Sequence, residues 1–514
     1  MKLRMNIKEA KEEIKRTLKA YTGCGRQPAR PIPPSKQRPI LLIGPPGIGK
    51  TAIMEQIAKE CGAGLVSYTM THHTRQSAIG LPYLKSETFE GETFQVTEYT
   101  MSEIIASVYD CMRTTGCRYG ILFIDEINCV SETLLPVMLQ FLQNKTFGTH
   151  RVPDHWMIVA AGNPPEYNRS VREFDMVTLD RVRKIELEAD YGVWKEYALT
   201  AGIHPAILSY LEIHPEYFYS SRLEAQHHAF VTARGWEDLS CILLSYEELE
   251  EPVSQQLMEQ YLQHEEIARD FALYYRLFRT YGEEYDIAAL LSSDEDAPFW
   301  KERCRRIACA SADEGLALSS LLYDYLSTCL ASFYEKQDFA EKISAHCDAL
   351  CRTCRSGSFF DDGSAYLKKQ RDIISIREKN TLYSPEEAAK EREVTALLEE
   401  WLLEIRTQKK NGSAASDDPV QQLLSRKEAQ KKTAAGLAAA VSSRMERAYR
   451  LILERGSEDI CVLHLTTDLS KNPQAAAFLF THPCGAYAEC CRHLLFSERE
   501  LAIQKEIATS EASS

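Results

Sequence analysis

A glycine-rich loop that ends in a lysine and a threonine carries the clearest chemical signal in this sequence. After the apolar run 40–43 the loop reads, in order, Gly44, Pro45, Pro46, Gly47, Ile48, Gly49, Lys50 and Thr51. Glycine has no Cβ atom, so backbone N–H groups in such a loop can turn inward around phosphate oxygens. The Lys50 ammonium is then placed to reach β- and γ-phosphates, and the Thr51 hydroxyl to hold Mg²⁺. We therefore expect these eight residues to bind a nucleoside triphosphate and its magnesium ion.

Two adjacent carboxylates follow a second apolar run. Residues 119–124 are nearly all apolar and lead directly to Asp125 and Glu126. Such a run is typical of a strand that is buried on both faces of a parallel sheet, and ligands bind where such strands end. We expect Asp125 to orient Mg²⁺ and Glu126 to polarise the attacking water as a general base. The two acids could otherwise only cap the next helix, an interpretation that the phosphate-binding loop argues against.

An asparagine stands at the end of a third apolar run. Asn163 follows residues 156–161 and precedes two prolines. At the carboxyl end of a neighbouring strand its amide could hydrogen-bond a γ-phosphate oxygen or the attacking water. The alternative is a turn-forming asparagine before proline, which is a common local pattern.

The elements that must position these groups alternate between strands and helices. Strands are expected at 40–43, 65–70, 119–124, 156–161 and 184–188, with helices between them. This pattern predicts an α/β fold with a doubly wound, five-stranded parallel sheet. The segment 72–100 is expected to be irregular, and it is long for a strand-to-helix loop, so we expect it to contact a partner or client. A short hairpin is possible at 147–152.

The rest of the chain is predicted to be mainly helical. From residue 191 onward the apolar periodicity is that of helices, first over 191–211 and 234–249. The expected organisation is an N-terminal helix and proline-rich connector, an α/β nucleotide-binding core, a helical lid, a helical region, a flexible linker and a helical C-terminal region. The N-terminal helix and connector span 1–36, the nucleotide-binding core 37–190 and the lid 191–250. The helical region spans 251–407, the flexible linker 408–420 and the C-terminal region 421–514.

Composition and charge limit the function classes. The net charge of −14 argues against nucleic-acid binding over the whole chain, although a local basic patch is compatible with it. No apolar run approaches the roughly 18 residues that span a bilayer, and the charged N-terminus lacks a signal peptide's apolar segment. We therefore expect a cytoplasmic protein without a membrane segment, in which the 16 cysteines are mostly reduced.

Taken together, the P-loop, Asp125 with Glu126, Asn163 and the stretch 179–181 resemble the AAA+ ATPases. Within them, the insertion 72–100, the stretch 161–165 and the stretch 232–236 resemble the MoxR-like branch. The resemblance covers about residues 35–250 and implies a homo-oligomeric ring, expected to be a hexamer, with ATP and Mg²⁺ between subunits. It also implies a partner with a von Willebrand factor A domain and a protein client that is remodelled or activated.

The resemblance further assigns roles to single residues. Asn163 would be sensor 1, Arg181 the arginine finger that reaches a neighbour's ATP, and Arg234 sensor 2 on the lid. Val182 stands where the family usually has an aromatic residue, so both Arg181 and Arg183 remain candidates for the finger.

Other readings of the sequence stay open or are set aside. The same core could drive a nucleic-acid motor or a nuclease-associated NTPase, or serve as a slow nucleotide-dependent assembly switch. The guanine-recognition pattern Asn-Lys-x-Asp is absent after the loop, which favours ATP over GTP. Two sets of possible metal ligands are read mainly as packing residues: Cys347, Cys351 and Cys354, and His482, Cys484, Cys490, Cys491 and His493.

Overall fold

The computed structural model describes residues 4–23, 32–70, 80–89, 92–130, 133–167, 174–224, 227–293, 297–353, 359–379, 383–410, 418–456 and 459–493. By packing, the chain divides into two compact units. The first, called here the α/β unit, comprises Met1–Lys195 and Pro215–Ile267. The second, the helical unit, comprises Glu196–His214 and Ala268–Ser514. The functional boundaries expected from the sequence stay predictions.

A six-stranded parallel sheet forms the centre of the α/β unit. Its strands, in spatial order, are β1 (Arg4–Met5), β10 (Arg183–Leu187), β2 (Ile40–Ile43), β9 (Trp156–Gly162), β6 (Gly120–Asp125) and β3 (Gly64–Thr69). The five predicted strands are all present, and every neighbouring pair is parallel. The prediction of a five-stranded sheet was wrong by one strand, because β1 is only two residues long and too short to show a periodicity.

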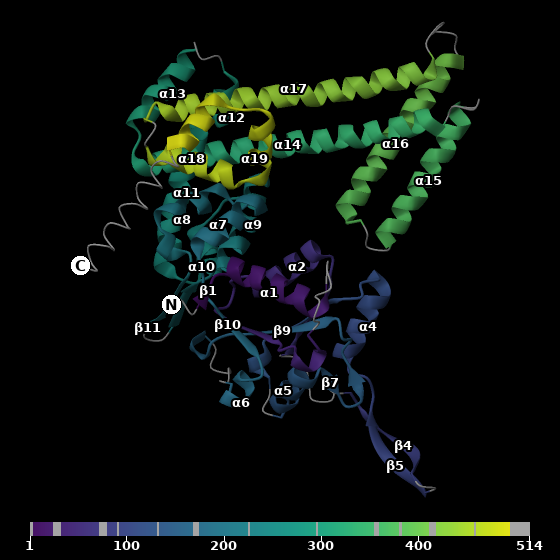
Figure 1. Cartoon of the computed structure of the whole chain (residues 1–514). Coiled ribbons are helices and arrows are strands. Elements are labelled where there is room, and N and C mark those ends of the chain that lie inside the picture. Colours follow the sequence, from purple (N-terminus) through teal and green to yellow (C-terminus); the bar gives the residue numbers. More distant parts are fainter. Residues whose placement is uncertain are drawn as a thin grey trace. The chain divides into compact units, whose positions relative to one another are not determined.

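Helices cover both faces of this sheet (Figure 1). One face packs against α1 (Ile7–Thr22) and α2 (Lys50–Cys61), and the other against α4 (Glu103–Thr115) and α5 (Leu135–Asn144). Successive residues of β2 alternate between the two cores: Ile40 and Leu42 face α1 and α2, whereas Leu41 faces α4 and α5. All three are at most 1% exposed, as expected for a strand that is buried on both faces.

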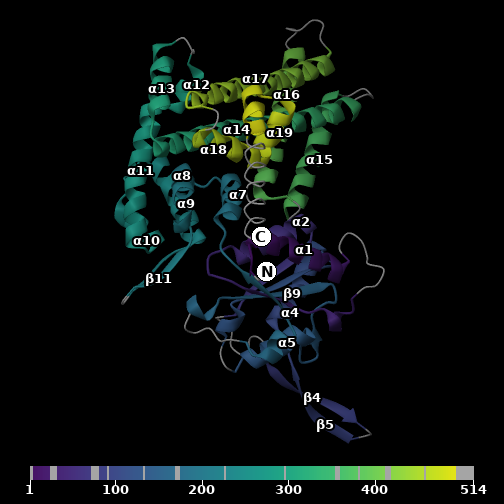
Figure 2. The ribbon, with the colours of Figure 1, turned by 60° about the vertical axis from the view of Figure 1, so that its left-hand side comes forward.

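The insertion between β3 and α4 forms a β-hairpin rather than the irregular segment predicted. Strands β4 (Pro82–Phe89) and β5 (Glu92–Tyr99) pair in antiparallel register, and the hairpin projects from the α/β unit (Figures 1 and 2). Residues 72–79 of the insertion lie outside the described residues. Each strand of the hairpin is largely exposed, so the apolar alternation that normally reveals a strand is missing. The short hairpin expected near 147–152 is present as β7 (Thr146–Phe147) and β8 (His150–Arg151).

The segment after β10 is not continuously helical, contrary to the prediction. A second hairpin, β11 (Ser220–Glu224) and β12 (His227–Val231), precedes α9 (Ala233–Glu248) and α10 (Gln255–Leu262). The helix predicted over 191–211 is two helices, α7 (Tyr191–Ala201) and α8 (Pro205–Ile213). Gly202 lies between them with φ +71°, and the imidazole of His204 caps α8, which explains the break. The remaining short helices are α6 (Met176–Leu179), η1 (Pro34–Lys36), η3 (Ile127–Cys129), η4 (Pro165–Tyr167) and η5 (Pro215–Tyr217).

The described part of the helical unit confirms the prediction of a helical C-terminal region. After α11 (Glu265–Tyr285) its helices are α12 (Ile287–Ser292), α13 (Pro298–Cys309), α14 (Ala312–Thr353), α15 (Phe359–Lys379), α16 (Pro385–Lys410), α17 (Pro419–Leu453), α18 (Ile460–Lys471) and α19 (Pro473–Thr481). The linker expected at 408–420 is shorter in the structure, because α16 reaches Lys410 and α17 begins at Pro419, and residues 411–417 lie outside the described residues.

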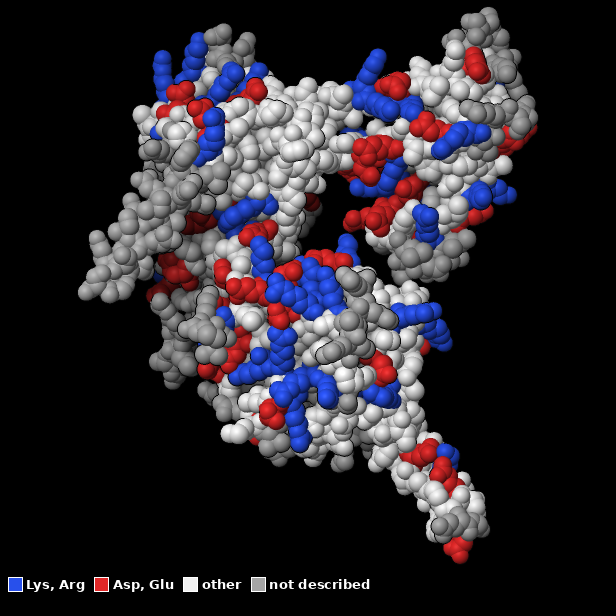
Figure 3. Space-filling model, viewed as in Figure 1, with Lys and Arg blue, Asp and Glu red and all other residues white. Residues whose placement is uncertain are grey.

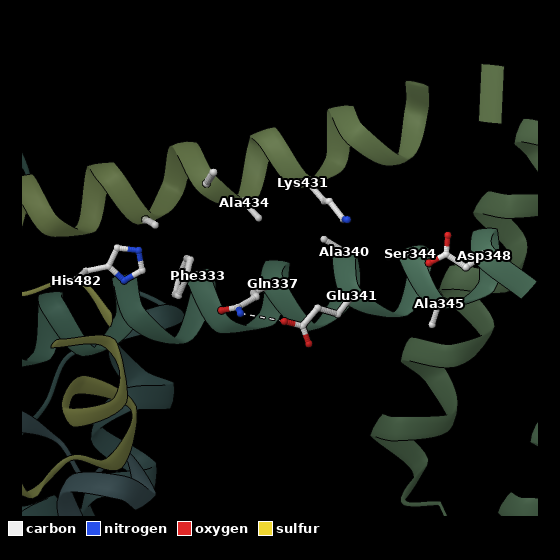
Figure 4. Close-up of a pocket in the computed structure, with 12 residues that line it drawn as sticks. Phe333, Gln337, Ala340, Glu341, Ser344, Ala345, Asp348, Lys431, Ala434 and His482 are labelled. Carbon is white, nitrogen blue, oxygen red and sulfur yellow. Dashed lines mark hydrogen bonds between the residues drawn. The ribbon is translucent and has the colours of Figure 1, made fainter. Parts of the chain in front are cut away.

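The two longest helices, α14 and α17, lie side by side (Figures 1 and 2). Where alanines of α17 face α14, they leave a groove of about 560 Å³ that Ala340, Ala434 and Lys431 help to line (Figure 4). We expected no segment that could span a membrane, yet Ala312–Arg352 of α14 is long and apolar enough to do so. Of its most apolar 18-residue window, 56% is buried within the structure, as in the core helix of a helical bundle.

Candidate functional site

The glycine-rich loop connects β2 to α2 at the carboxyl edge of the sheet. Gly47 and Gly49 have φ values of +73° and +90°, a region that residues with a Cβ rarely adopt. Gly44 donates its N–H to the Gly162 carbonyl at 3.3 Å, and a Cβ on Gly44 would lie 2.6 Å from Leu187 Cβ. No side chain caps α2 at Gly49, so the first N–H groups of this helix remain available to an anion. The loop therefore has the cradle geometry that its sequence predicts.

Lys50 lies at the centre of the site and is only 8% exposed. Its Nζ donates hydrogen bonds to the carbonyl oxygens of Gly44 (2.8 Å) and Pro45 (2.9 Å) and to Asn163 Oδ1 (2.8 Å). Burial lowers the pKa of Lys50 to about 8, although the nearby Asp125 carboxylate opposes the shift. The structure thus brings together Lys50 and Asn163, which lie 113 residues apart in the sequence.

Thr51 and Asp125 meet beside Lys50. The Thr51 hydroxyl donates a hydrogen bond to Asp125 Oδ2 at 3.1 Å, and both side chains are half-buried. A hydroxyl and a carboxylate oxygen are the ligands that Mg²⁺ takes at phosphate sites, where substrate and water supply the remaining oxygens. The two residues therefore fit the prediction that they bind Mg²⁺, because such a site does not require the protein to supply every ligand.

Glu126 has an unusual backbone conformation. Its φ of +56° lies in the left-handed region, and its N–H donates to Asp125 Oδ1 at 2.9 Å. Non-glycine residues in this conformation are uncommon and gather at functional sites. The turn leads the chain from β6 into η3, directly after the carboxylate that accepts the Thr51 hydrogen bond.

Asn128 and Gly162 fix Asn163, and the sequence interpretation missed both. Asn128 is 3% exposed, and its Nδ2 donates to the Asn163 carbonyl at 2.7 Å. A Cβ on Gly162 would lie 2.4 Å from Asn128 Oδ1, so only glycine leaves room for that side chain. The sequence does show Gly162 directly before Asn163 and Asn128 two residues after Glu126. No local sequence pattern indicates, however, that these two residues lie in contact.

The start of α9 lies against the glycine-rich loop. Thr232 caps this helix through its side chain, and a Cβ on Gly47 would lie 3.0 Å from Thr232 Cβ and 3.4 Å from Arg234 Cβ. The Tyr219 hydroxyl donates to the Pro46 carbonyl at 3.1 Å. The charge of the exposed Arg234 side chain also contributes to the lowered pKa of Lys50. The structure therefore places Arg234 beside the loop, and its role as sensor 2 stays a prediction.

The two candidate arginines after α6 differ in their contacts. Arg183 is half-buried and binds α1, donating to Thr17 Oγ1 at 2.8 Å and pairing with Glu13. Arg181 is exposed and donates to Gln143 Oε1 at 2.7 Å. Among the described contacts, neither arginine reaches the glycine-rich loop of its own chain.

The cysteine clusters do not form a metal site in the described part of the chain. No group of three or more His, Cys, Asp or Glu side chains that could hold a metal ion occurs among the described residues. This includes all five C-terminal candidates from His482 to His493, whereas Cys354 lies outside the described residues. Burial raises the pKa of the Cys347 thiol to about 12, and Cys484 and Cys490 are also buried, as expected for cysteines that serve as apolar packing residues.

Part of the chain is similar to a known protein family. Residues 39–182 match the family model of the AAA domain, dynein-related subfamily. No curated protein matches the chain significantly. The matched range begins just before β2 and ends just before Arg183, so it contains the glycine-rich loop, both carboxylates and Asn163.

Proposed function

We propose, from the AAA domain in residues 39–182, that this chain is a MoxR-like AAA+ ATPase whose ring remodels or activates a protein client in the cytoplasm. The observation that carries the proposal is one cluster: Lys50 Nζ bonded to Asn163 Oδ1, with Thr51 bonded to Asp125 beside it. AAA domains generally hydrolyse ATP with Mg²⁺, and these groups are the ones that such a reaction requires.

Each side chain of the cluster has a definite task in this proposal. When ATP binds, Lys50 donates to phosphate oxygens in place of the carbonyl and amide oxygens that accept its hydrogen bonds in the free protein. Asn163, released from Lys50, then hydrogen-bonds the γ-phosphate or the attacking water. Glu126, whose carboxylate forms no hydrogen bond with another described residue, accepts the proton of that water. Thr51 and Asp125 would hold Mg²⁺, which when bound neutralises charge on the β- and γ-phosphates.

Arg181 is the arginine finger in this proposal, and the finger acts on a neighbouring subunit. Arg183 is engaged by Glu13 and Thr17 of its own chain, whereas Arg181 is exposed and bonds only a neutral side chain among its described hydrogen bonds. A guanidinium supplied in trans accelerates phosphoryl transfer by roughly 10³–10⁵-fold. A shared active site would make turnover depend on assembly into a ring, which we propose to be a hexamer.

The test mixes two inactive variants. Arg181→Ala should bind ATP but turn over slowly, and Glu126→Gln should do the same for a different reason. Random equal mixing makes about a quarter of the interfaces complete if the finger acts in trans, so steady-state ATPase activity should reappear. The matched control is Arg38→Ala, which removes an exposed arginine next to Asp180 and should leave turnover unchanged. Undiminished turnover by Arg181→Ala alone would refute its role.

The exposed β4–β5 hairpin supports the proposal of a protein partner or client. Six large apolar residues in and beside it are 38–71% exposed: Leu81, Tyr83, Leu84, Phe89, Phe94 and Tyr99. Phe89 and Phe94 pair across the strands with ring centroids 6.1 Å apart. Charged side chains, mostly acidic, also lie on the hairpin (Figure 3). Exposed apolar patches of this kind mark protein-binding surfaces, so a client, or a partner with a von Willebrand factor A domain, would dock here.

The alternative of a nucleic-acid motor finds less support. Lysines and arginines gather on the face of the α/β unit around α1 (Figure 3), but acidic residues of the same face neutralise many of them. Lys11 and Lys15 both pair with Glu60, and Lys184 pairs with Glu186. Filter binding of DNA and RNA at two salt concentrations would distinguish the two functions, since a phosphate-binding surface loses affinity steeply with salt. A slow assembly switch would instead show no increase in turnover with a client.

A further inference from the structure

The helical unit contains a cavity of about 370 Å³ whose wall includes both polar and apolar side chains. It lies among the end of α7, the start of α8, one face of α14 and the junction of α18 with α19. The apolar part of the wall includes Leu199, Ile203 and Leu208. Residues of α14 and of the α18–α19 junction contribute the polar groups. Its volume is that of a site for a small organic molecule.

Two polar side chains in its wall are almost fully buried. Asp468 is 2% exposed and Ser320 is 3% exposed, and both line the cavity. The Ser320 hydroxyl has no hydrogen-bond partner among the described residues. Leaving a buried hydroxyl unpaired is costly, and native proteins rarely do so without a ligand or water to pair it. Ser320 is therefore an independent sign that something polar occupies this space.

The rest of the polar wall is held rigidly. The Tyr323 hydroxyl donates to the Leu199 carbonyl at 3.2 Å and accepts from Asn472 Nδ2 at 3.0 Å. Asn472 in turn caps α19 through its Oδ1. Behind Asp468, His464 Nε2 lies 3.4 Å from Asp468 Oδ2, and His464 Nδ1 lies 2.5 Å from Ser319 Oγ. These contacts fix the wall before any ligand arrives, which lowers the entropic cost of binding.

The charges of the wall select the ligand. Two carboxylates line the cavity, the buried Asp468 and the exposed Asp324, and none of the described lining residues is a lysine, arginine or histidine. An anion would therefore be repelled. The described residues offer no group of three metal ligands here, which argues against a metal ion. A cation with its own hydrocarbon portion fits both the carboxylates and the apolar wall.

We propose that this cavity binds a small primary alkylamine. The ammonium group donates hydrogen bonds to the Asp468 carboxylate and to Ser320 Oγ, and the alkyl chain packs against Leu199, Ile203 and Leu208. Asp324 attracts the amine and pairs with a second ammonium group when the ligand is a diamine. Hydrogen bonds to charged groups are the strong ones, so these two side chains decide affinity.

The test is isothermal titration of the full chain with n-butylamine and 1,4-diaminobutane, and with n-butanol and butyrate as neutral and anionic counterparts. The amines should bind at millimolar concentration or below, and the diamine should bind more tightly, whereas butanol and butyrate should not bind. Equal binding of butanol and butylamine, or binding of neither amine, would overturn the proposal.

Two variants locate the binding. Asp468→Asn should weaken butylamine binding about tenfold or more, and Ser320→Ala several-fold. Ser332→Ala, an exposed serine of the same helix outside the cavity, is the matched control and should change nothing. Ser320→Ala removes an unpaired buried hydroxyl, so this variant should fold with an unchanged or raised melting temperature. It therefore tests whether the amine binds in this cavity even if Asp468→Asn does not fold. Amine binding that survives Ser320→Ala at full strength refutes the site.

Discussion

ATP binding should be linked to proton uptake by Lys50 between pH 7 and pH 9. In the free protein, burial lowers the pKa of Lys50 to about 8, since its three acceptors are neutral oxygens and Asp125 compensates only in part. A bound polyphosphate adds several negative charges beside Nζ and therefore raises that pKa strongly. Below pH 8 the lysine already carries its proton. Above pH 8 it must take up a proton in order to bind.

The size of the effect follows from the pKa. Lys50 is about 90% protonated at pH 7 and about 10% protonated at pH 9, so the apparent affinity for ATP should fall about tenfold over this range, or about 1.4 kcal/mol. Proton uptake on binding should rise from about 0.1 to about 0.9 per site over the same range. Titration calorimetry in two buffers of different ionisation enthalpy measures both quantities.

A second buried lysine provides the control. Burial also lowers the pKa of Lys145 to about 8, but Lys145 Nζ donates to Gln37 Oε1 and to the Trp156 carbonyl, at the opposite end of β9 from Asn163. Nucleotide binding should not change its charge, so Lys145→Gln should retain the full proton uptake. A constant affinity from pH 7 to pH 9, with no proton uptake, would refute the argument that burial controls the charge of Lys50.

Three further outcomes are expected. Gly162→Ala should lower stability by about 1–3 kcal/mol in thermal unfolding and should lower ATP turnover, because its Cβ overlaps Asn128 Oδ1, and the added change Asn128→Ala should restore part of the stability. Wild-type stability and turnover in Gly162→Ala would contradict this packing argument. Glu126→Gln should bind ATP analogues normally but lower turnover about 10²–10⁴-fold, and a loss of only a few-fold would remove it from the role of base. Replacing residues 82–99 with a Gly-Ser turn should preserve basal ATPase activity and abolish stimulation by a client, and a folded variant without basal activity would show that the hairpin belongs to the hydrolytic core.

Local patterns in the sequence were sufficient for the α/β core. The apolar runs 119–124 and 156–161 predicted strands that are buried on both faces, and β6 and β9 are such strands and are neighbours. Because parallel strands end at one edge of the sheet, the position of Asp125 and Asn163 near the loop also followed. The glycines at 47 and 49 predicted a tight turn, and both have positive φ values.

Partners that are distant in the sequence were not predictable. The exposed strands β4 and β5 bury neither face, so their residues show no alternation, and β1 is too short to show any pattern. The two arginines after α6 look equivalent in the sequence, and only the approach of α1, which brings Glu13 to Arg183, separates them.

By itself the sequence therefore determined which residues could bind phosphate and magnesium, because a short loop and the ends of buried strands are local features. The tertiary structure alone decided which neutral oxygens hold Lys50, which side chain pins Asn163, and which polar groups share a cavity in the helical unit. The contacts that decide these points join residues that are distant in the sequence, 35 positions apart for Asn128 and Asn163 and 113 for Lys50 and Asn163. Their formation depends on the packing of the whole unit, which no local periodicity records.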